Sequence, residues 1–95
     1  MLFMVIERFK NSDPGPVGER FRGEGRMLPD GVIYHASWMQ TNGATCYQLM
    51  EAPNRELLGQ WMARWSDLVE FEVVPVATSA EYWSKASDVL SSALY

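Results

Sequence analysis

Residues that could hold a metal or form disulfides are almost absent from this sequence. Its 95 residues include one cysteine, Cys46, and one histidine, His35. A lone cysteine cannot form a disulfide within the chain, and one cysteine with one histidine cannot complete a Cys/His zinc site. We therefore expect no metal site, and nothing in the sequence predicts a cofactor.

Basic residues and long apolar runs are also scarce. Eight Lys and Arg residues stand against twelve Asp and Glu residues, which gives a net charge of −4. Nucleic acids and anionic membranes attract basic surfaces, so we expect neither as a partner. No apolar run approaches the roughly 18 residues of a membrane span. The apolar start lacks the basic region and cleavage site of a signal peptide, and we expect a cytoplasmic, bacterial protein.

Large apolar side chains, by contrast, are plentiful. Hydrophobic residues make up 47% of the chain and aromatic residues 13%, with four each of Trp, Tyr and Phe. A chain of this length forms one domain and buries roughly 60–70% of the surface that it exposes when unfolded. So many rings favour self-association, which would bury more of this surface.

The hydrophobic pattern predicts four strands and three helices within one domain, residues 1–95. The strands are expected at residues 2–9, 32–40, 45–51 and 69–76, with an Asn-Gly hairpin turn between the second and third. The first helix should start at Ser12 or Asp13 and run to Leu28 despite its glycines, and the second should follow Asn54 and run to Leu68. A capping box at Thr78 should open the third helix, over residues 79–95.

This order of elements, βαββαβ over residues 1–78, is that of a ferredoxin-like α+β fold with a four-stranded antiparallel sheet. Both predicted helices of this core cover one face of the sheet. Each strand carries apolar residues at both parities, so the other face must also be apolar. We therefore expect a homodimer in which two sheets face each other.

Five segments of the chain resemble a known family. They are Met1–Phe9, Gly25–Pro29, Ser37–Trp38, Tyr47–Glu51 and Trp65–Pro75. With this spacing the chain, up to about residue 78, resembles the family called domain of unknown function 3303, which is similar to dimeric α/β-barrel proteins. The resemblance implies two ferredoxin-like subunits packed sheet to sheet around a cavity. Proteins of that kind include monooxygenases, isomerases, haem-degrading proteins and ligand sensors, so the resemblance implies no single activity.

Alternation along the strands indicates which side chains share a face of the sheet. We expect the more mixed sets to line the dimer cavity and the more apolar sets to face the helices. The mixed sets are Phe3, Val5 and Glu7 in the first strand, Ile33, His35, Ser37 and Met39 in the second, and Cys46, Gln48 and Met50 in the third, with Glu70 and Glu72 from the fourth.

The polar members of these sets suggest two alternative functions. The ligand-binding hypothesis has a small, partly apolar molecule held in the cavity by His35, Gln48, Ser37, Glu7 and Met50. The catalytic hypothesis makes His35, Glu7 or Glu72 the acid or base of a cofactor-independent monooxygenase or isomerase. A third alternative is that the dimer itself is the function, with these residues hydrogen-bonded or solvated.

Other residues also admit a structural and a functional interpretation. Cys46 is either a nucleophile paired with His35 or a small buried apolar group. Trp38 and the Trp61/Trp65 pair either stack on a flat ligand or belong to the core. The arginines of the first helix, Arg20, Arg22 and Arg26, either bind an anionic ligand or form a solvated face with neighbouring glutamates.

Overall fold

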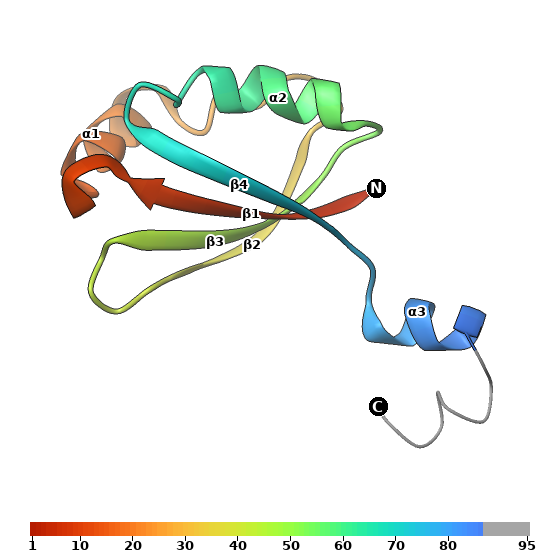
Figure 1. Ribbon diagram of the computed structural model, residues 1–95. Helices are drawn as coiled ribbons and strands as arrows, with labels where there is room; N and C mark the ends of the chain where they lie inside the picture. Colours follow the sequence, from red (N-terminus) through yellow and green to blue (C-terminus); the bar gives the residue numbers. More distant parts are fainter. Residues whose placement is uncertain (87–95) are drawn as a thin grey trace.

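The computed structural model describes residues 1–86 of the chain (Figure 1). Its elements are β1 (Leu2–Phe9), a short 3-10 turn (Lys10–Ser12), α1 (Gly15–Glu24), β2 (Ile33–Met39), β3 (Thr45–Glu51), α2 (Arg55–Ala63), β4 (Val69–Val76) and α3 (Ser79–Ala86). The four predicted strands and three predicted helices are therefore present. The predicted continuation of the last helix, residues 87–95, lies outside the described residues.

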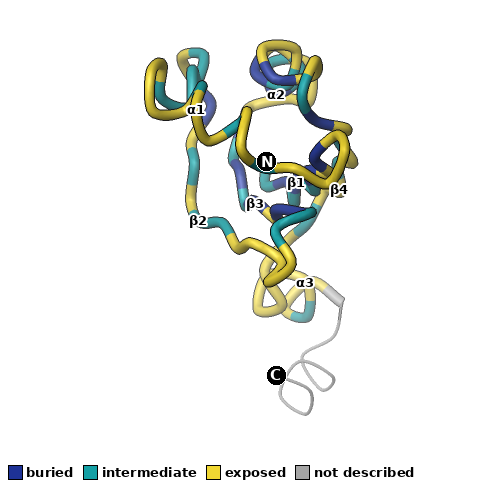
Figure 2. The backbone as a smooth tube through the Cα atoms, turned by 90° about the vertical axis from the view of Figure 1, so that its left-hand side faces the viewer, coloured by how far each residue is buried: buried dark blue, intermediate teal, exposed yellow. Residues whose placement is uncertain are grey.

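The four strands form one antiparallel sheet in the order β2-β3-β1-β4. Helices α1 and α2 lie on one side of this sheet, whereas α3 follows β4 and lies on the other side, away from them (Figures 1 and 2). This is a small α+β arrangement compatible with the ferredoxin-like fold. None of the helices in residues 1–86 is long and apolar enough to cross a membrane.

Two of the predicted helix caps are confirmed. The Asn54 side chain accepts a hydrogen bond from the Leu57 amide at 2.8 Å, and Thr78 Oγ1 accepts one from the Glu81 amide at 3.1 Å. Each cap satisfies a backbone N–H group that has no partner inside the first turn of a helix.

The first two helices end earlier than predicted. Helix α1 begins at Gly15, whose amide donates to the Asp13 carboxylate, and it stops at Glu24 rather than Leu28. It stops there because Gly25 adopts a φ of 68°, a conformation that is incompatible with a right-handed helix. Helix α2 ends at Ala63, and hydrogen-bonded turns replace the predicted last turn up to Leu68.

The core lies between the sheet and the helices. Its largest fully buried side chains are Phe3 and Val5 of β1, Met50 of β3, and Leu58 and Trp61 of α2. The buried stretches in Figure 2 accordingly lie along the strands and on α2. None of the α1 residues is buried, so this helix covers the sheet less closely than α2 does.

The predicted assignment of strand faces is wrong for β1 and β3. Phe3, Val5 and Met50 pack beneath the helices and not toward an open cavity, and Glu7 and Gln48 share their parity. The error has a physical cause: the polar Glu7 and Gln48 lie in a pocket on the helix side, so that side is not the more apolar one. Strand parity then turns the even-numbered residues of β1 toward the uncovered side.

A bulge in β2 separates two residues that were predicted to share a face. The pairing of β2 with β3 shifts between Tyr34 and Ala36, so that Ser37 pairs with Gln48 on the helix side. His35 instead lies on the uncovered side, where its ring meets Glu51. A bulge adds one residue to a strand and thereby reverses the alternation beyond it.

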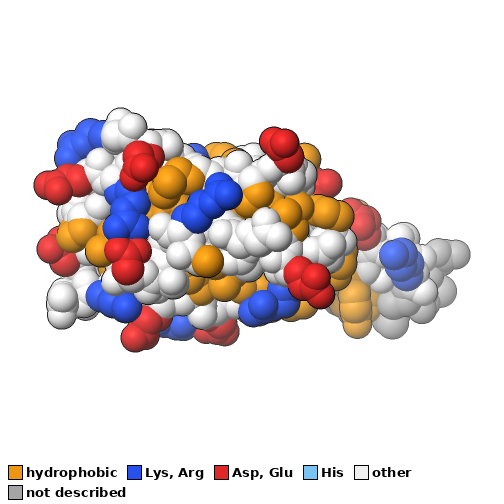
Figure 3. Space-filling model, turned by 90° about the horizontal axis from the view of Figure 1, so that it is seen from above, with side chains coloured by type: hydrophobic (Ala, Val, Ile, Leu, Met, Phe, Trp, Pro, Cys, Tyr) orange, Lys and Arg blue, Asp and Glu red, His pale blue; other side chains and the backbone are white. Residues whose placement is uncertain are grey.

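The side of the sheet opposite α1 and α2, which no helix covers within residues 1–86, is mainly apolar, and we call it the open face. Its polar members include Arg8, His35, Glu51 and Glu72, and its apolar members are Leu2, Met4, Ile6, Ile33, Ala36, Trp38, Tyr47, Leu49, Val74 and Val76, as the strand pairing requires. Trp38 has 56% of its surface exposed and Ile33 has 49%. The helix-covered side in Figure 3, by contrast, mixes charged side chains of both signs with apolar patches.

Candidate functional site

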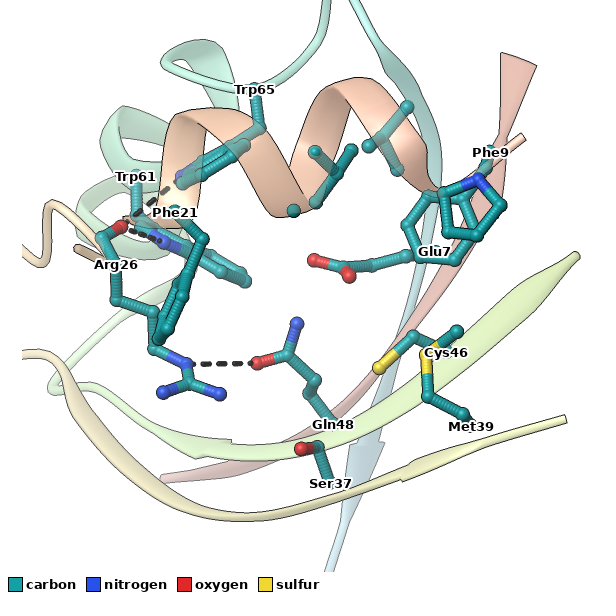
Figure 4. A pocket seen from close by; sticks show the side chains of 14 residues that line it. Glu7, Phe9, Phe21, Arg26, Ser37, Met39, Cys46, Gln48, Trp61 and Trp65 are labelled. Carbon is teal, nitrogen blue, oxygen red and sulfur yellow. Dashed lines mark hydrogen bonds between the residues drawn. The ribbon is translucent and has the colours of Figure 1, made fainter. Parts of the chain in front are cut away.

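A pocket of about 310 Å³ lies between α1, α2 and the helix side of the sheet (Figure 4). Most of its wall is apolar and comes from Phe9, Pro14, Val17, Gly18, Phe21, Met39, Cys46, Trp61, Trp65 and Val69. Four polar side chains complete the wall: Glu7, Arg26, Ser37 and Gln48. The pocket exists because α1 does not pack closely on β1 and β3. None of the α1 residues is buried, and Gly18 has no side chain that could fill the space.

Three of the polar side chains form a chain of interactions across the pocket. The Nε atom of Arg26 donates to Oε1 of Gln48 at 3.4 Å (Figure 4). Because a guanidinium only donates, this contact assigns the oxygen of the amide to Arg26 and turns its nitrogen toward Glu7. Gln48 therefore links a carboxyl group on β1 to a positive charge in the loop after α1.

Glu7 is the deepest of these groups, with 5% of its surface exposed. Burial raises the pKa of its carboxyl group from 4.5 to about 7, because the ionised form loses its hydration. The hydrogen bond with Gln48 and the charge of Arg26 lower this pKa but do not cancel the effect of burial. Near neutral pH both protonation states of Glu7 are therefore populated, so it can accept or donate a proton.

Arg26 is fixed from two sides. Its carbonyl oxygen accepts hydrogen bonds from the indole nitrogens of Trp61, at 3.0 Å, and Trp65, at 3.1 Å. Its guanidinium group lies 3.5 Å from the ring centroid of Tyr34 and 5.2 Å from that of Phe21. The two tryptophans thus hold the loop backbone, and the cation–π contacts hold the side chain beside the pocket.

Arg20 ties helix α1 to the turns that follow α2. This side chain makes two hydrogen bonds to the Asp67 carboxylate, at 2.8 and 2.6 Å, and one to the carbonyl oxygen of Arg64. Arg20 therefore pairs across the fold, in contrast to the predicted solvated face shared with Glu19 and Glu24. The pair places α1 over the pocket and close to α2.

The structure does not bring Cys46 and His35 together. Cys46 lines the pocket, but burial and the neighbouring Glu7 raise the pKa of its thiol to about 11. The thiol therefore stays protonated at neutral pH and is a poor nucleophile. His35 lies on the open face with its Nε2 atom 2.8 Å from Glu51, next to a more open hollow lined also by Leu2 and Glu81.

Three of the predicted site residues meet in the pocket: Glu7, Gln48 and Ser37. The others lie elsewhere. Met50 is fully buried in the core, and Glu72 forms an ion pair with Arg8 at 2.9 Å, with both side chains about half exposed.

Sequence reasoning missed how Arg26 contributes to this site. It treated Arg26 as one of three arginines on a helix, whereas the residue lies in the loop beyond α1. The paired tryptophans carry the signal that could have placed it. A buried indole N–H group needs a hydrogen-bond acceptor. Two indoles one helical turn apart can share a single acceptor, which here is the carbonyl oxygen of Arg26.

Comparison with known proteins identifies the family of the chain. No curated protein and no solved structure matches it. The model of one family matches residues 1–90, which extends past the core into the third helix. The chain therefore belongs to the family described as domain of unknown function (DUF3303).

Proposed function

We propose that each subunit binds a small, largely apolar molecule in the pocket beneath α1, with a polar group of that molecule held at Glu7. The observation that carries the proposal is a carboxyl group buried in a wall made mostly of apolar side chains. Burying an ionisable group opposes folding, so a group kept there serves a function more readily than stability. The volume, about 310 Å³, lies at the small end of ordinary ligand pockets.

Two half-exposed side chains form the proposed entrance to this pocket. Phe21 on α1 has 43% of its surface exposed and Met39 on β2 has 50%, and both line the wall. A ligand entering between them meets apolar surface first and Glu7 last. Apolar area then supplies most of the binding free energy, and Glu7 fixes the orientation.

Gly18 allows a direct test of this proposal. It lines the pocket, and a Cβ atom built there would have no described atom within 4 Å. The Gly18→Val variant should fill the pocket and weaken binding of the fluorescent probe N-phenylnaphthylamine by about tenfold or more, the usual effect of an added group in an apolar pocket. Gly23→Val is the matched control, since Gly23 is on the same helix, equally unobstructed and outside the pocket. Equal binding to both variants and the wild type would contradict the proposal.

A second candidate function is proton transfer by Glu7, which would make the protein an enzyme such as an isomerase or a cofactor-independent monooxygenase. The pKa of about 7 favours it, because an acid or base works best when its pKa is near the ambient pH. The test is solvent deuterium exchange into the carbon acid tetralone, followed by NMR. Glu7→Gln should abolish any acceleration, whereas Glu56→Gln, a change at an exposed residue of α2, should retain it. The same rate in both variants would exclude Glu7 as the base.

We also propose that two copies of the chain pair through their open faces. The apolar centre of this face has polar pairs at both ends, Arg8 with Glu72 at one and His35 with Glu51 at the other. An apolar centre with a polar rim is typical of subunit interfaces. The pockets would then lie on the outer sides of the dimer, and its two sheets would form the interface. The pairing is the one expected of dimeric α/β-barrel proteins.

Light scattering after gel filtration tests this pairing. Trp38→Lys places a charge at an exposed apolar position of the open face, on the edge strand β2, and should give a monomer. Phe21→Lys changes a similarly exposed ring on the helix side and should leave a dimer. A wild-type protein that elutes as a monomer at high concentration would contradict the pairing but would leave the pocket unaffected.

A further inference from the structure

We infer that the molecule bound in the pocket is a flat compound with a weakly acidic hydroxyl group, a phenol or an enol, whose hydroxyl hydrogen is donated to the Glu7 carboxylate. This inference rests on the proposed binding function and names the chemical class of its ligand. It follows from the hydrogen-bonding capacity that the pocket leaves unused and from the shape of its wall.

The buried end of the pocket, at Glu7, can accept a further hydrogen bond. A carboxylate offers about four acceptor sites, and Gln48 supplies one donor to Glu7. The Gln48 oxygen already accepts from Arg26, and the Ser37 hydroxyl shares a hydrogen bond of 2.7 Å with the Tyr34 hydroxyl. Glu7 therefore keeps acceptor sites at the buried end, and a hydroxyl group of a ligand can fill one of them.

The wall of the pocket favours a flat partner. Four aromatic rings reach it: Phe9 from β1, Phe21 from α1, Trp61 from α2 and Trp65 from the turn after α2 (Figure 4). Aromatic side chains contribute large contact areas and pack favourably against other rings. A planar ring bearing a hydroxyl group matches this combination of apolar walls and one deep acceptor.

The charges around Glu7 favour a ligand that carries a neutral hydroxyl group over a ligand that carries a carboxylate. Arg26 is the positive group that acts on Glu7, and the Cys46 thiol is its titratable neighbour on β3. Helices α1 and α2 and strands β2 and β4 present neutral side chains to the described pocket. Ionised Glu7 and Arg26 balance each other, so a neutral hydroxyl compound keeps the pocket neutral. An anionic ligand would keep it neutral only with Glu7 protonated.

These two classes therefore predict opposite responses to pH. With a Glu7 pKa of about 7, the ionised fraction rises about tenfold between about pH 6 and about pH 8. Calorimetric titration with naphthol should show a dissociation constant that falls about tenfold over this range. Naphthoic acid should respond in the opposite direction, and naphthalene should bind equally at both pH values.

Two variants connect the response to Glu7 itself. Glu7→Gln preserves the shape of the side chain without an ionisable group, so naphthol should bind about tenfold more weakly at pH 8 than to wild type and without a pH response. Glu56→Gln should keep the wild-type response, since Glu56 is exposed on α2.

The possible failures are distinguishable. If naphthol and naphthalene bind equally and without pH response, and Gly18→Val blocks both, the ligand class is wrong but the pocket is correct. If naphthoic acid binds more tightly than naphthol at pH 8, the hydroxyl assignment is overturned in favour of an anion. If none of the three compounds binds, both the ligand class and the proposed function are wrong.

Discussion

Replacing Glu7 by Gln should stabilise the protein, and the gain should depend on pH. The pKa of Glu7 rises from 4.5 in the unfolded chain to about 7 in the fold. The folded state therefore holds this proton more tightly than the unfolded state. Between these two pKa values the unfolded chain releases the proton while the folded protein retains it, so stability falls as pH rises.

The size of this effect follows from the shift. One pKa unit corresponds to about 1.4 kcal/mol, so a rise from 4.5 to about 7 makes the folded state about 3 kcal/mol less stable above pH 7 than below pH 4. The Gln side chain carries no ionisable group and avoids this cost. The difference in free energy of unfolding between Glu7→Gln and wild type should therefore increase by about 3 kcal/mol from about pH 4 to about pH 8.

Urea unfolding followed by tryptophan fluorescence measures this difference at each pH and at equal protein concentration. Other titrating groups contribute equally to both proteins and cancel. Glu56→Gln serves as the control, and its difference from wild type should not vary by more than a few tenths of a kcal/mol. A Glu7→Gln difference that is also independent of pH would refute the assignment of a buried carboxyl group with a raised pKa.

The remaining predictions concern the backbone and the thiol. Gly25→Ala should destabilise the protein by about 1–3 kcal/mol, because φ is 68° and ψ is −159° there, a conformation almost restricted to glycine, and an added Cβ would meet no neighbouring atom within 4 Å, so the cost is conformational. Gly23→Ala, inside α1 and equally unobstructed, should stabilise it by about 0.5–1 kcal/mol, and both are measured by urea unfolding. Asn54→Ala should lower the free energy of unfolding by about 1 kcal/mol through loss of the α2 cap, seen as a lower Tm; no change would contradict the capping role. Cys46 should react with a thiol reagent at pH 8 far more slowly in the folded protein than in urea, because its pKa is about 11; equal rates would contradict its burial.

The elements of the fold could be predicted because their signals are local. Strands β1, β3 and β4 lie where apolar runs end at turn residues, and their bounds agree with the prediction. The helix caps are local as well: the Asn54 and Thr78 side chains each accept a hydrogen bond from a backbone amide three residues later in the chain. The family model likewise confirms the resemblance to domain of unknown function 3303.

The faces of the strands could not be predicted in the same way. In β1 the set Leu2, Met4 and Ile6 is the more apolar one, yet the set with Glu7 faces the helices. Composition therefore indicates the wrong face for this strand. The bulge after Tyr34 arises from strand pairing that no single strand encodes. Both decisions depend on packing between distant segments.

The candidate site was only partly visible in the sequence for the same reason. Glu7, Gln48 and Ser37 are polar residues within predicted strands, and the structure brings them together in the pocket. Arg26 joins them through contacts with residues more than twenty positions away, which no local pattern indicates. The homodimer and the cytoplasmic location stay predictions.

The protonation state of Glu7, followed with and without a bound hydroxyl compound, is the most direct test of the proposed pocket. Carbon-detected NMR of the side-chain carboxyl groups, recorded from about pH 4 to about pH 9 with and without naphthol, follows each glutamate separately. We expect a Glu7 pKa near 7 that falls when naphthol binds, whereas the signal of the exposed Glu56 should not respond to naphthol. A Glu7 pKa near 4.5 that naphthol does not alter would contradict this expectation.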